Sequence, residues 1–272
     1  MILNQSMEFP KELKPYEEEL KKTLKPFIKI ETIPESKPKI YESKFGGNPY
    51  LPKNTEHPIE PSGVPMILLA QINFEEVPEF QNMPQKGMLQ FFISPIEDED
   101  IYYGLDLDNP TIQEHFKVVY HENVITDENL LVTDFSYMDK YGIDYEIAPV
   151  STEVSIKFKL NTQPITATDY RFEQLVESNK VFKQLWDDED ASDCHYEEFY
   201  GGHQIEGYSS FTQTDPREAE ELQKYDIMLL QIDTDDEVDI MFGDAGIANF
   251  FIKSEDLKNL NFKDILYNWD CG

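Results

Sequence analysis

Arginine is almost absent from this chain, and basic residues as a group are scarce. The 272 residues include 23 Lys or Arg against 54 Asp or Glu, which gives a formal net charge of −31, and the only arginines are Arg171 and Arg217. A nucleic-acid-binding protein neutralises phosphates with a basic face, and an anionic membrane surface attracts a basic one. The composition therefore argues against nucleic acid and membrane as partners. It also nearly excludes arginine clamps for phosphate or carboxylate ligands.

Cysteine and long apolar runs are also scarce. Cys194 and Cys271 are the only cysteines; two are too few for a zinc site of four thiolates, and low cysteine use is typical of a reducing compartment. The most apolar stretch, residues 66–70, is far shorter than the roughly 20 residues that a membrane-spanning helix needs. The first residues lack the charged-then-apolar pattern of a secretory signal. We therefore expect a cytoplasmic protein.

Motifs that would assign a reaction are missing too. The chain has no Gly-x-x-x-x-Gly-Lys-Ser/Thr, Gly-x-Gly-x-x-Gly or Gly-x-Ser-x-Gly sequence, so no phosphate-binding loop, dinucleotide site or serine nucleophile is predicted. Residues 233–239 resemble a calcium loop, but Val238 stands where that loop needs glycine, and a solvated turn is favoured. Cys194, His195 and His203 lie among carboxylates, yet their spacing matches no metal motif. We predict no cofactor and no metal site.

The chain nevertheless has enough apolar residues for a folded core. Hydrophobic residues make up 40% of it and aromatic residues 13%, as expected of a globular protein. The charge is uneven, because residues 1–50 have a balance of +1 and residues 51–272 a balance of −32. A basic partner is therefore expected to bind the body of the protein and not its N-terminal part.

Three short blocks occur twice in the same order, which indicates an internal repeat. Each copy runs from a glycine pair through an apolar segment ending in Gln-Ile-Asn or Gln-Ile-Asp to a glycine that leads an aromatic segment. The paired blocks are 45–48 and 200–203, 66–73 and 227–233, and 87–93 and 246–252, at offsets of 155, 160 and 159 residues. We predict a single domain, residues 1–272, with an N-terminal helical segment at 1–39, a first repeat at 40–150 and a second repeat at 151–272.

The patterns within these segments predict a mixed fold. The repeated blocks are short apolar runs bounded by Gly, Pro and acidic residues, which predicts buried strands, and the alternation over 153–160 predicts a half-exposed strand. Apolar spacing predicts helices at 15–27 and 168–186, and Asp215 before Pro216 predicts a helix start. The expected fold is α+β and internally duplicated, with two related halves of mainly antiparallel sheet and flanking helices, fused into one unit.

The same blocks resemble a known family. The segments 45–52, 69–73, 87–92, 230–233 and 243–246 together are similar to the YwqG-like family of bacterial proteins. The resemblance covers roughly residues 40–270. It implies a cytosolic α+β protein with an internal duplication, and it implies no activity because the family is a domain of unknown function. A looser association of such families with bacterial toxin–immunity regions implies a binding role.

Polar residues of the repeated blocks form the candidate site. Paired glycines allow positive φ or a close backbone approach, and both glycine pairs precede a polar residue. If the two loops line a shared cleft, their polar groups would converge in a pocket; alternatively, the two glutamines are buried amides that tie the sheet to a loop. Phe91, Phe92, Phe250 and Phe251 are expected in the core. The candidate binding residues are Gly46, Gly47, Asn48, Gln71, Gly201, Gly202, His203, Gln231, Asp233 and Asp244.

Two classes of function remain open. The leading hypothesis is a non-enzymatic binding protein whose acidic surface engages a basic protein partner and steers the encounter. The alternative is a hydrolase-type enzyme that works in a cleft between the two repeats, with His203 and a carboxylate such as Asp244 as acid–base groups. The sequence identifies no catalytic residue beyond this pairing, which the positions of His203 and Asp244 test.

Overall fold

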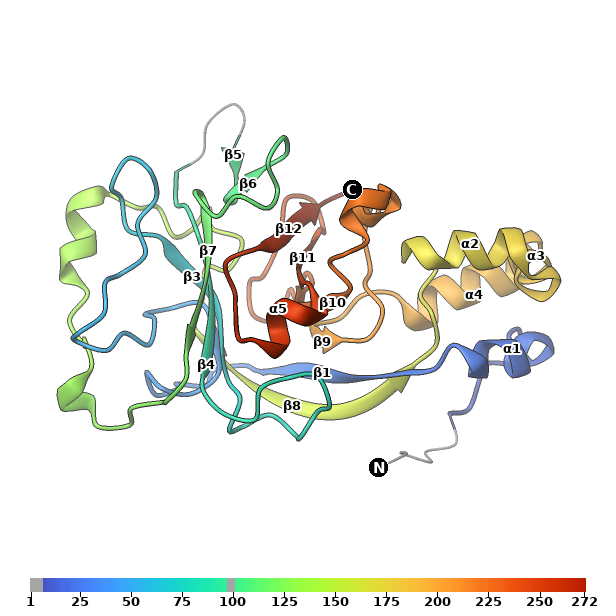
Figure 1. Ribbon diagram of the computed structural model, residues 1–272, viewed down its shortest axis with the longest axis horizontal. Coiled ribbons are helices and arrows are strands. Elements are labelled where there is room, and N and C mark those ends of the chain that lie inside the picture. Colours follow the sequence, from blue (N-terminus) through green and yellow to red (C-terminus); the bar gives the residue numbers. More distant parts are fainter. Residues whose placement is uncertain (1–6, 97–100) are drawn as a thin grey trace.

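The computed structural model describes residues 7–96 and 101–272, and its main feature is one large antiparallel sheet (Figure 1). Its ten strands follow the order β12-β11-β10-β9-β1-β8-β2-β3-β4-β7. The long strands β1 (Lys25–Ile33) and β8 (Val154–Gln163) pair at the centre, from Lys25 opposite Gln163 to Ile33 opposite Ser155. The first and second parts of the chain are therefore joined through the middle of a single sheet.

Two arms extend from this central pair and curl toward each other, so that the sheet is nearly closed (Figure 1). The first arm consists of β2 (Lys44–Phe45), β3 (Ile67–Asn73), β4 (Met88–Ile93) and β7 (Phe116–His121). The second arm consists of β9 (Gln204–Glu206), β10 (Ile227–Ile232), β11 (Ile247–Ile252) and β12 (Ile265–Asp270). A separate ribbon of β5 (Ile101–Tyr102) and β6 (Leu105–Asp106) lies beside β12, because the Trp269 indole N–H donates to the Tyr102 carbonyl.

Aromatic side chains from both arms meet inside the curled sheet. Phe91 of β4 and Phe250 of β11 pack with ring centroids 4.8 Å apart, and Phe250 stacks on Tyr267 of β12 at 4.4 Å. Such ring pairs contribute roughly 0.5–1.5 kcal/mol beyond the burial of their apolar area. The prediction that Phe91, Phe92, Phe250 and Phe251 belong to the core is confirmed, because each is at most 1% exposed.

Helices gather at one end of the sheet (Figure 1). The helices α1 (Glu17–Lys22), α2 (Tyr170–Ser178), α3 (Lys180–Asp187) and α4 (Glu189–Phe199) share one apolar cluster. The remaining helices are short. They are α5 (Ser254–Lys258) and the 3-10 helices η1 (Lys14–Tyr16), η2 (Glu128–Leu130), η3 (Ser136–Tyr141), η4 (Pro216–Glu218) and η5 (Glu220–Leu222). Within the described ranges, no helix combines the length and the apolar character that crossing a bilayer requires.

The strands predicted from the sequence are confirmed, and the helices are shorter than predicted. The apolar blocks form β3, β4, β10 and β11, residues 153–160 fall largely within β8, and Asp215 begins η4. The helix predicted at 15–27 ends at Lys22, because Pro26 cannot extend a helix and the backbone from Lys25 onward pairs with β8. The helix predicted at 168–186 breaks at Asn179, whose side chain accepts the N–H of Val181 and begins α3.

The strand pairs β3–β4 and β10–β11 each contain one register shift. The β3–β4 register shifts between Leu68 and Ala70, and the β10–β11 register shifts between Met228 and Leu230. A register shift of this kind bends the strand and increases its local twist. The two arms therefore bend at corresponding places, and corresponding positions in them can be compared residue by residue.

Candidate functional site

Gln71 and Gln231 are buried amides that tie a loop to the sheet, one in each arm. The Gln71 side chain accepts the N–H of Tyr50 at 2.8 Å and donates to two carbonyls of residues 40–42 at 2.8 and 2.7 Å. The Gln231 side chain accepts the N–H of Ser210 at 2.7 Å and donates to a loop carbonyl at 2.7 Å. Both residues are 0% exposed. Their amide groups satisfy the backbone of the loop, which a buried loop requires, and are not available to a ligand.

The glycine pairs do not take matching positions in the two arms. Gly46 and Gly47 follow β2, whereas Gly201 and Gly202 precede β9. Lys44 of β2 pairs with Gln71, as Gln204 of β9 pairs with Gln231, so the register matches residues 46–47 with residues 206–207. Residues 46, 47, 206 and 207 all have positive φ, between 62° and 81°. The two Gly-Gly pairs are therefore five residues out of register with each other, because the position that matches Gly46 is Glu206, which also has a left-handed backbone.

Gly202, His203 and Asp233 come together where β9 begins and β10 ends. The Gly202 N–H donates to the Asp233 carboxylate at 2.6 Å, and the Asp233 N–H donates to Nδ1 of His203 at 3.0 Å. Nε2 of His203 lies 3.5 Å from the carboxylate of Asp235, and its hydrogen bond lowers the pKa of Asp235 to about 2. Both ring nitrogens of His203 therefore face groups of the protein, so acid–base work by this ring requires the present pairing to break.

Asp244 does not join this cluster. It is exposed in the connection between β10 and β11, where its backbone carbonyl accepts the N–H of Gly272 at 3.0 Å. The carboxylate beside His203 is that of Asp235, which the sequence did not single out as a site residue. The acid–base pair of His203 and Asp244 thus has no support in the contacts of the described residues.

The loops that carry the glycine pairs line two different cavities. The β3 cavity, of about 270 Å³, includes Gly47 and Asn48 in its lining. The β9 cavity, of about 340 Å³, includes Gly201, Gly202 and His203. The two cavities have no lining residue in common. The candidate residues are therefore divided between two sites and do not converge in one cleft.

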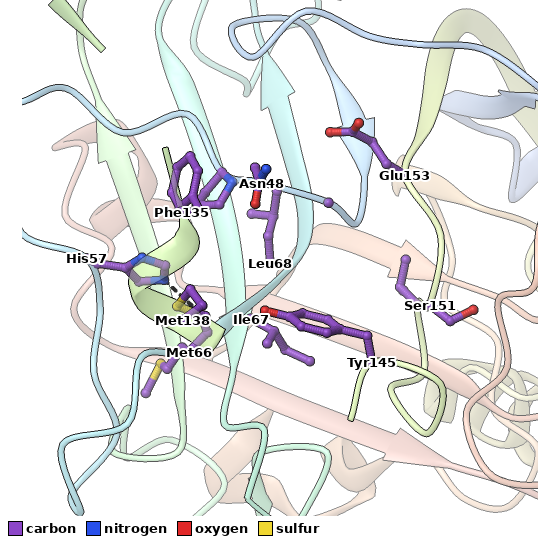
Figure 2. Close-up of a pocket in the computed structure, with 13 residues that line it drawn as sticks. Asn48, His57, Met66, Ile67, Leu68, Phe135, Met138, Tyr145, Ser151 and Glu153 are labelled. Carbon is purple, nitrogen blue, oxygen red and sulfur yellow. Dashed lines mark hydrogen bonds between the residues drawn. The ribbon is translucent and has the colours of Figure 1, made fainter. Parts of the chain in front are cut away.

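The β3 cavity has an aromatic wall and a polar wall (Figure 2). His57, Phe135 and Met138 lie on one side, and Tyr145, Ser151 and Glu153 on the other. None of these six residues was among the sequence-derived candidates. Met66 and the first two residues of β3, Ile67 and Leu68, connect the two walls. The cavity thus offers ring faces, a thioether and a carboxylate to a single bound group.

Hydrogen bonds fix the ring of His57 against the strand. Nε2 lies 2.8 Å from the Met66 carbonyl, which can only accept, so Nε2 carries the proton. Nδ1 lies 2.6 Å from the Tyr137 hydroxyl and accepts from it. Burial lowers the pKa of His57 and keeps the ring neutral at neutral pH. His57 therefore contributes an aromatic surface and no positive charge to the cavity.

The carboxylate at the rim belongs to an ion pair that is half buried. Nζ of Lys44 lies 2.5 Å from Oε1 of Glu153; the Lys44 side chain is 1% exposed and that of Glu153 is 40% exposed. Burial lowers the pKa of Lys44, and the neighbouring Glu153 opposes this shift. The pair is thus closed to solvent at its positive end and open to solvent at its negative end.

The cavity is bordered by an exposed acidic segment, residues 122–153. The segment holds eight acidic residues and only one lysine, Lys140, a net charge of −7. All eight acidic residues are exposed: Glu122, Asp127, Glu128, Asp134, Asp139, Asp144, Glu146 and Glu153. Tyr137, Tyr141 and Tyr145 of the same segment are between 36% and 46% exposed. This combination of acidic and tyrosine side chains is the signal in the sequence that could have pointed to the cavity, and the sequence analysis did not use it.

Both arginines of the chain belong to one network of ion pairs, formed at the starts of α2 and η4 and packed against the second arm. Arg217 is 2% exposed and contacts the carboxylates of Asp215 at 2.7 Å and Asp169 at 3.4 Å, while Arg171 contacts Asp169 at 2.5 Å. Burial acts to raise the pKa of Asp169, but the two guanidinium groups outweigh it and lower the pKa. The guanidinium carbon of Arg217 lies 4.0 Å from the ring centre of Phe251. The Asp-x-Arg pattern, which occurs at 169–171 and 215–217, could have indicated this network from the sequence.

The geometry of the described residues gives little support for a metal site or a nucleophilic cysteine. Across residues 7–96 and 101–272, no group of three or more His, Cys, Asp or Glu side chains is placed to hold a metal ion. Cys194 and Cys271 are free thiols. Burial raises the pKa of Cys194, and nearby carboxylates, that of Glu12 first among them, raise it further. The Cys194 thiol is therefore less readily ionised than an ordinary cysteine, which disfavours it as a nucleophile.

Comparison with known proteins assigns the chain to a family and to no activity. No curated protein matches it. The family described as a domain of unknown function, DUF1963, matches residues 43–271, which include both arms of the sheet and the linings of both cavities except for a few residues of β1 and the N-terminal part. Because the match covers most of its length, the chain belongs to the DUF1963 family.

Proposed function

We propose that this protein is a non-enzymatic binding protein whose acidic surface engages a basic protein partner. The acidic segment carries the proposal, since its eight acidic side chains are all exposed. In the described part of the chain, ion pairs engage only two of them, Glu122 with Lys86 and Glu153 with Lys44. Six exposed carboxylates are left for interaction with cations from outside the chain.

The N-terminal part shows the opposite arrangement of charge. Lys14 and Lys21 both pair with Glu17, and Lys22 pairs with Glu19. Positive and negative groups therefore cancel locally there, whereas the acidic segment projects an uncompensated negative field. Such a field accelerates encounter with a basic surface and weakens as salt is added, since the Debye length is only about 8 Å at physiological ionic strength.

Affinity capture with charge variants tests the proposal. The test variant neutralises four residues of the acidic segment by Asp134→Asn, Asp139→Asn, Asp144→Asn and Glu146→Gln. The matched control makes the same change in charge on α4 by Asp190→Asn, Asp193→Asn, Glu197→Gln and Glu198→Gln. We expect a defined basic protein to be retained at low salt by the wild type and the control, and to be lost from the test variant and at high salt. Retention that is indifferent to salt, or the same on all three proteins, contradicts the proposal.

We also infer that the two arms arose by internal duplication. The buried amides of Gln71 and Gln231, 160 residues apart, hold loop residues Tyr50 and Ser210 that are also 160 residues apart. The matching register shifts of the two hairpins support the same inference. A solved structure of a relative with a single arm, assembled as a dimer with the same ten-stranded order, would be the strongest independent support.

A cytoplasmic location is proposed as well. Both cysteines are free, which suits a reducing compartment. Membership of the narrower YwqG-like group remains a prediction from the sequence blocks.

A further inference from the structure

The register of the two arms matches Phe92 of β4 with Phe251 of β11, so the side chains that pack against these two rings can be compared directly. Leu68 pairs with Phe92 immediately before the register shift of β3–β4, and Met228 pairs with Phe251 immediately before the shift of β10–β11. Phe92 and Phe251 thus occupy corresponding places, and each is at most 1% exposed. What packs against these two rings shows how each arm uses the same position.

In the second arm, the chain places its own cation on the ring. The guanidinium carbon of Arg217 lies 4.0 Å from the centre of Phe251, and the carboxylates of Asp215 and Asp169 lie 2.7 and 3.4 Å from the guanidinium. Arg217 is 2% exposed, so the site is closed to solvent. This position in the fold therefore accommodates a positive group between an aromatic face and carboxylates.

In the first arm, a neutral ring and an open cavity replace the arginine. The centre of the His57 ring lies 6.0 Å from that of Phe92, and His57 lines the β3 cavity. None of the described residues that line this cavity is Lys or Arg. Phe92 therefore packs against a neutral ring that lines a cavity, and the lining of that cavity also includes the Tyr145 ring and the Glu153 carboxylate.

We propose that the β3 cavity binds one lysine or arginine side chain of the basic partner, between the Tyr145 ring and the Glu153 carboxylate. This inference rests on the proposed function and adds to it a contact site and a class of recognised group. Glu153 uses Oε1 for Lys44 and remains 40% exposed, so its carboxylate is open to a second cation. Tyr145 is 46% exposed and faces the cavity in Figure 2. Its phenolic ring supplies the face over which a cation binds.

The size and charge of the cavity select this ligand class over others. A volume of about 270 Å³ lies below the roughly 300–1,000 Å³ of cavities that enclose whole small molecules, which suits one side chain. An anion would meet the net charge of −7 of the bordering segment, and Lys44, which contacts the lining residue Glu153, is already paired with it. A neutral apolar group would gain nothing from the exposed carboxylates. A cation on an alkyl chain uses both the apolar wall and the acidic rim.

Methyl NMR of the intact protein tests the site without any partner. Met66 and Met138 line the cavity among the eight methionines of the chain, so their ¹³C-labelled methyl groups report on occupancy. The probe is n-butylammonium, and n-butanol serves as the neutral probe of the same chain length. We expect the two methyl signals to shift with n-butylammonium and not with n-butanol. Glu153→Gln and Tyr145→Leu should each weaken binding roughly two- to fivefold, whereas Glu197→Gln, an exposed residue of α4 outside the lining, should not.

The outcomes separate this inference from the proposed function. Equal shifts with both probes, or no shift of Met66 and Met138, overturn the cation site whatever the partner does. If the acidic segment variant loses the basic partner but Tyr145→Leu and Glu153→Gln retain it fully, the proposed function stands and the side-chain site is refuted. If n-butylammonium binds as expected and no basic protein is captured at low salt, the cation site stands and the proposed function fails.

Discussion

Acidification should destabilise the protein through His195, a buried histidine of α4. The side chain is 1% exposed and its ring stacks on Phe172 with centroids 5.1 Å apart. Among the described residues Nε2 has no hydrogen-bond partner, and the only bond of the ring is to the backbone of Ile165. Burial lowers the pKa of His195 from 6.5 to about 4. The folded protein therefore holds this ring in the neutral form.

The size and sign of the effect follow from these two pKa values. Between pH 6.5 and 4 the unfolded chain binds a proton at His195 that the folded chain does not bind, so the free energy of unfolding falls as the pH falls. The contribution is fully present above pH 6.5 and is lost through this window. A difference of about 2.5 between the pKa values corresponds to a total of about 3 kcal/mol, of which about 2 kcal/mol is lost by pH 5. This is a large share of the stability of an ordinary domain.

Urea unfolding at pH 7, 6 and 5, followed by tryptophan fluorescence, measures this loss in the wild type and in His195→Phe. Carboxylates also titrate near pH 5, but they are common to both proteins, so the difference between the two pH profiles isolates His195. We expect the wild type to lose about 2 kcal/mol more than the variant between pH 7 and 5, even if the variant is less stable at pH 7. Parallel profiles would refute the reasoning.

Three further predictions concern stability. Arg217→Met should lower the free energy of unfolding by about 3–5 kcal/mol, because it leaves buried carboxylates unpaired. Arg217→Lys should restore only part of this loss. A Met variant with the same melting temperature as the wild type contradicts the role of the network. Gly46→Ala should cost far more than Gly142→Ala in urea unfolding. Both glycines have φ of 63°, but a Cβ at Gly46 would lie 2.1 Å from a backbone oxygen and one at Gly142 has nothing within 4 Å, so equal losses would be inconsistent with this argument. Gln71→Leu should cost about 1–3 kcal/mol for each backbone group left unpaired, and hydrogen exchange at the Tyr50 amide should accelerate; an unchanged exchange rate would show that the amide tie is dispensable.

The strands were predictable because their signal is local. The segments that form β3 and β10 are apolar at nearly every position, and both strands are buried throughout. The helix ends were not predictable, because tertiary pairing overrides local spacing. Residues 25–27 continue a helical apolar pattern, yet pairing with β8 makes them the start of β1. Propensity acts within a few residues, whereas this pairing joins segments more than 120 residues apart.

The candidate site was less predictable, because the sequence shows which residues are similar and not which positions are equivalent. The two Gly-Gly pairs match as letters, but the register equates Gly46 with Glu206, a residue that adopts φ of 62° without being glycine. The same register equates Phe92 with Phe251 and so exposes a difference that the sequence comparison hid: one ring packs against an arginine, the other against a neutral histidine beside a cavity. Two arms that share a register are informative where they differ, because the packing that one arm completes internally indicates the chemistry that the other arm leaves open. By this argument, replacing Arg217 is expected to impair folding, whereas replacing Tyr145 is expected to impair only binding.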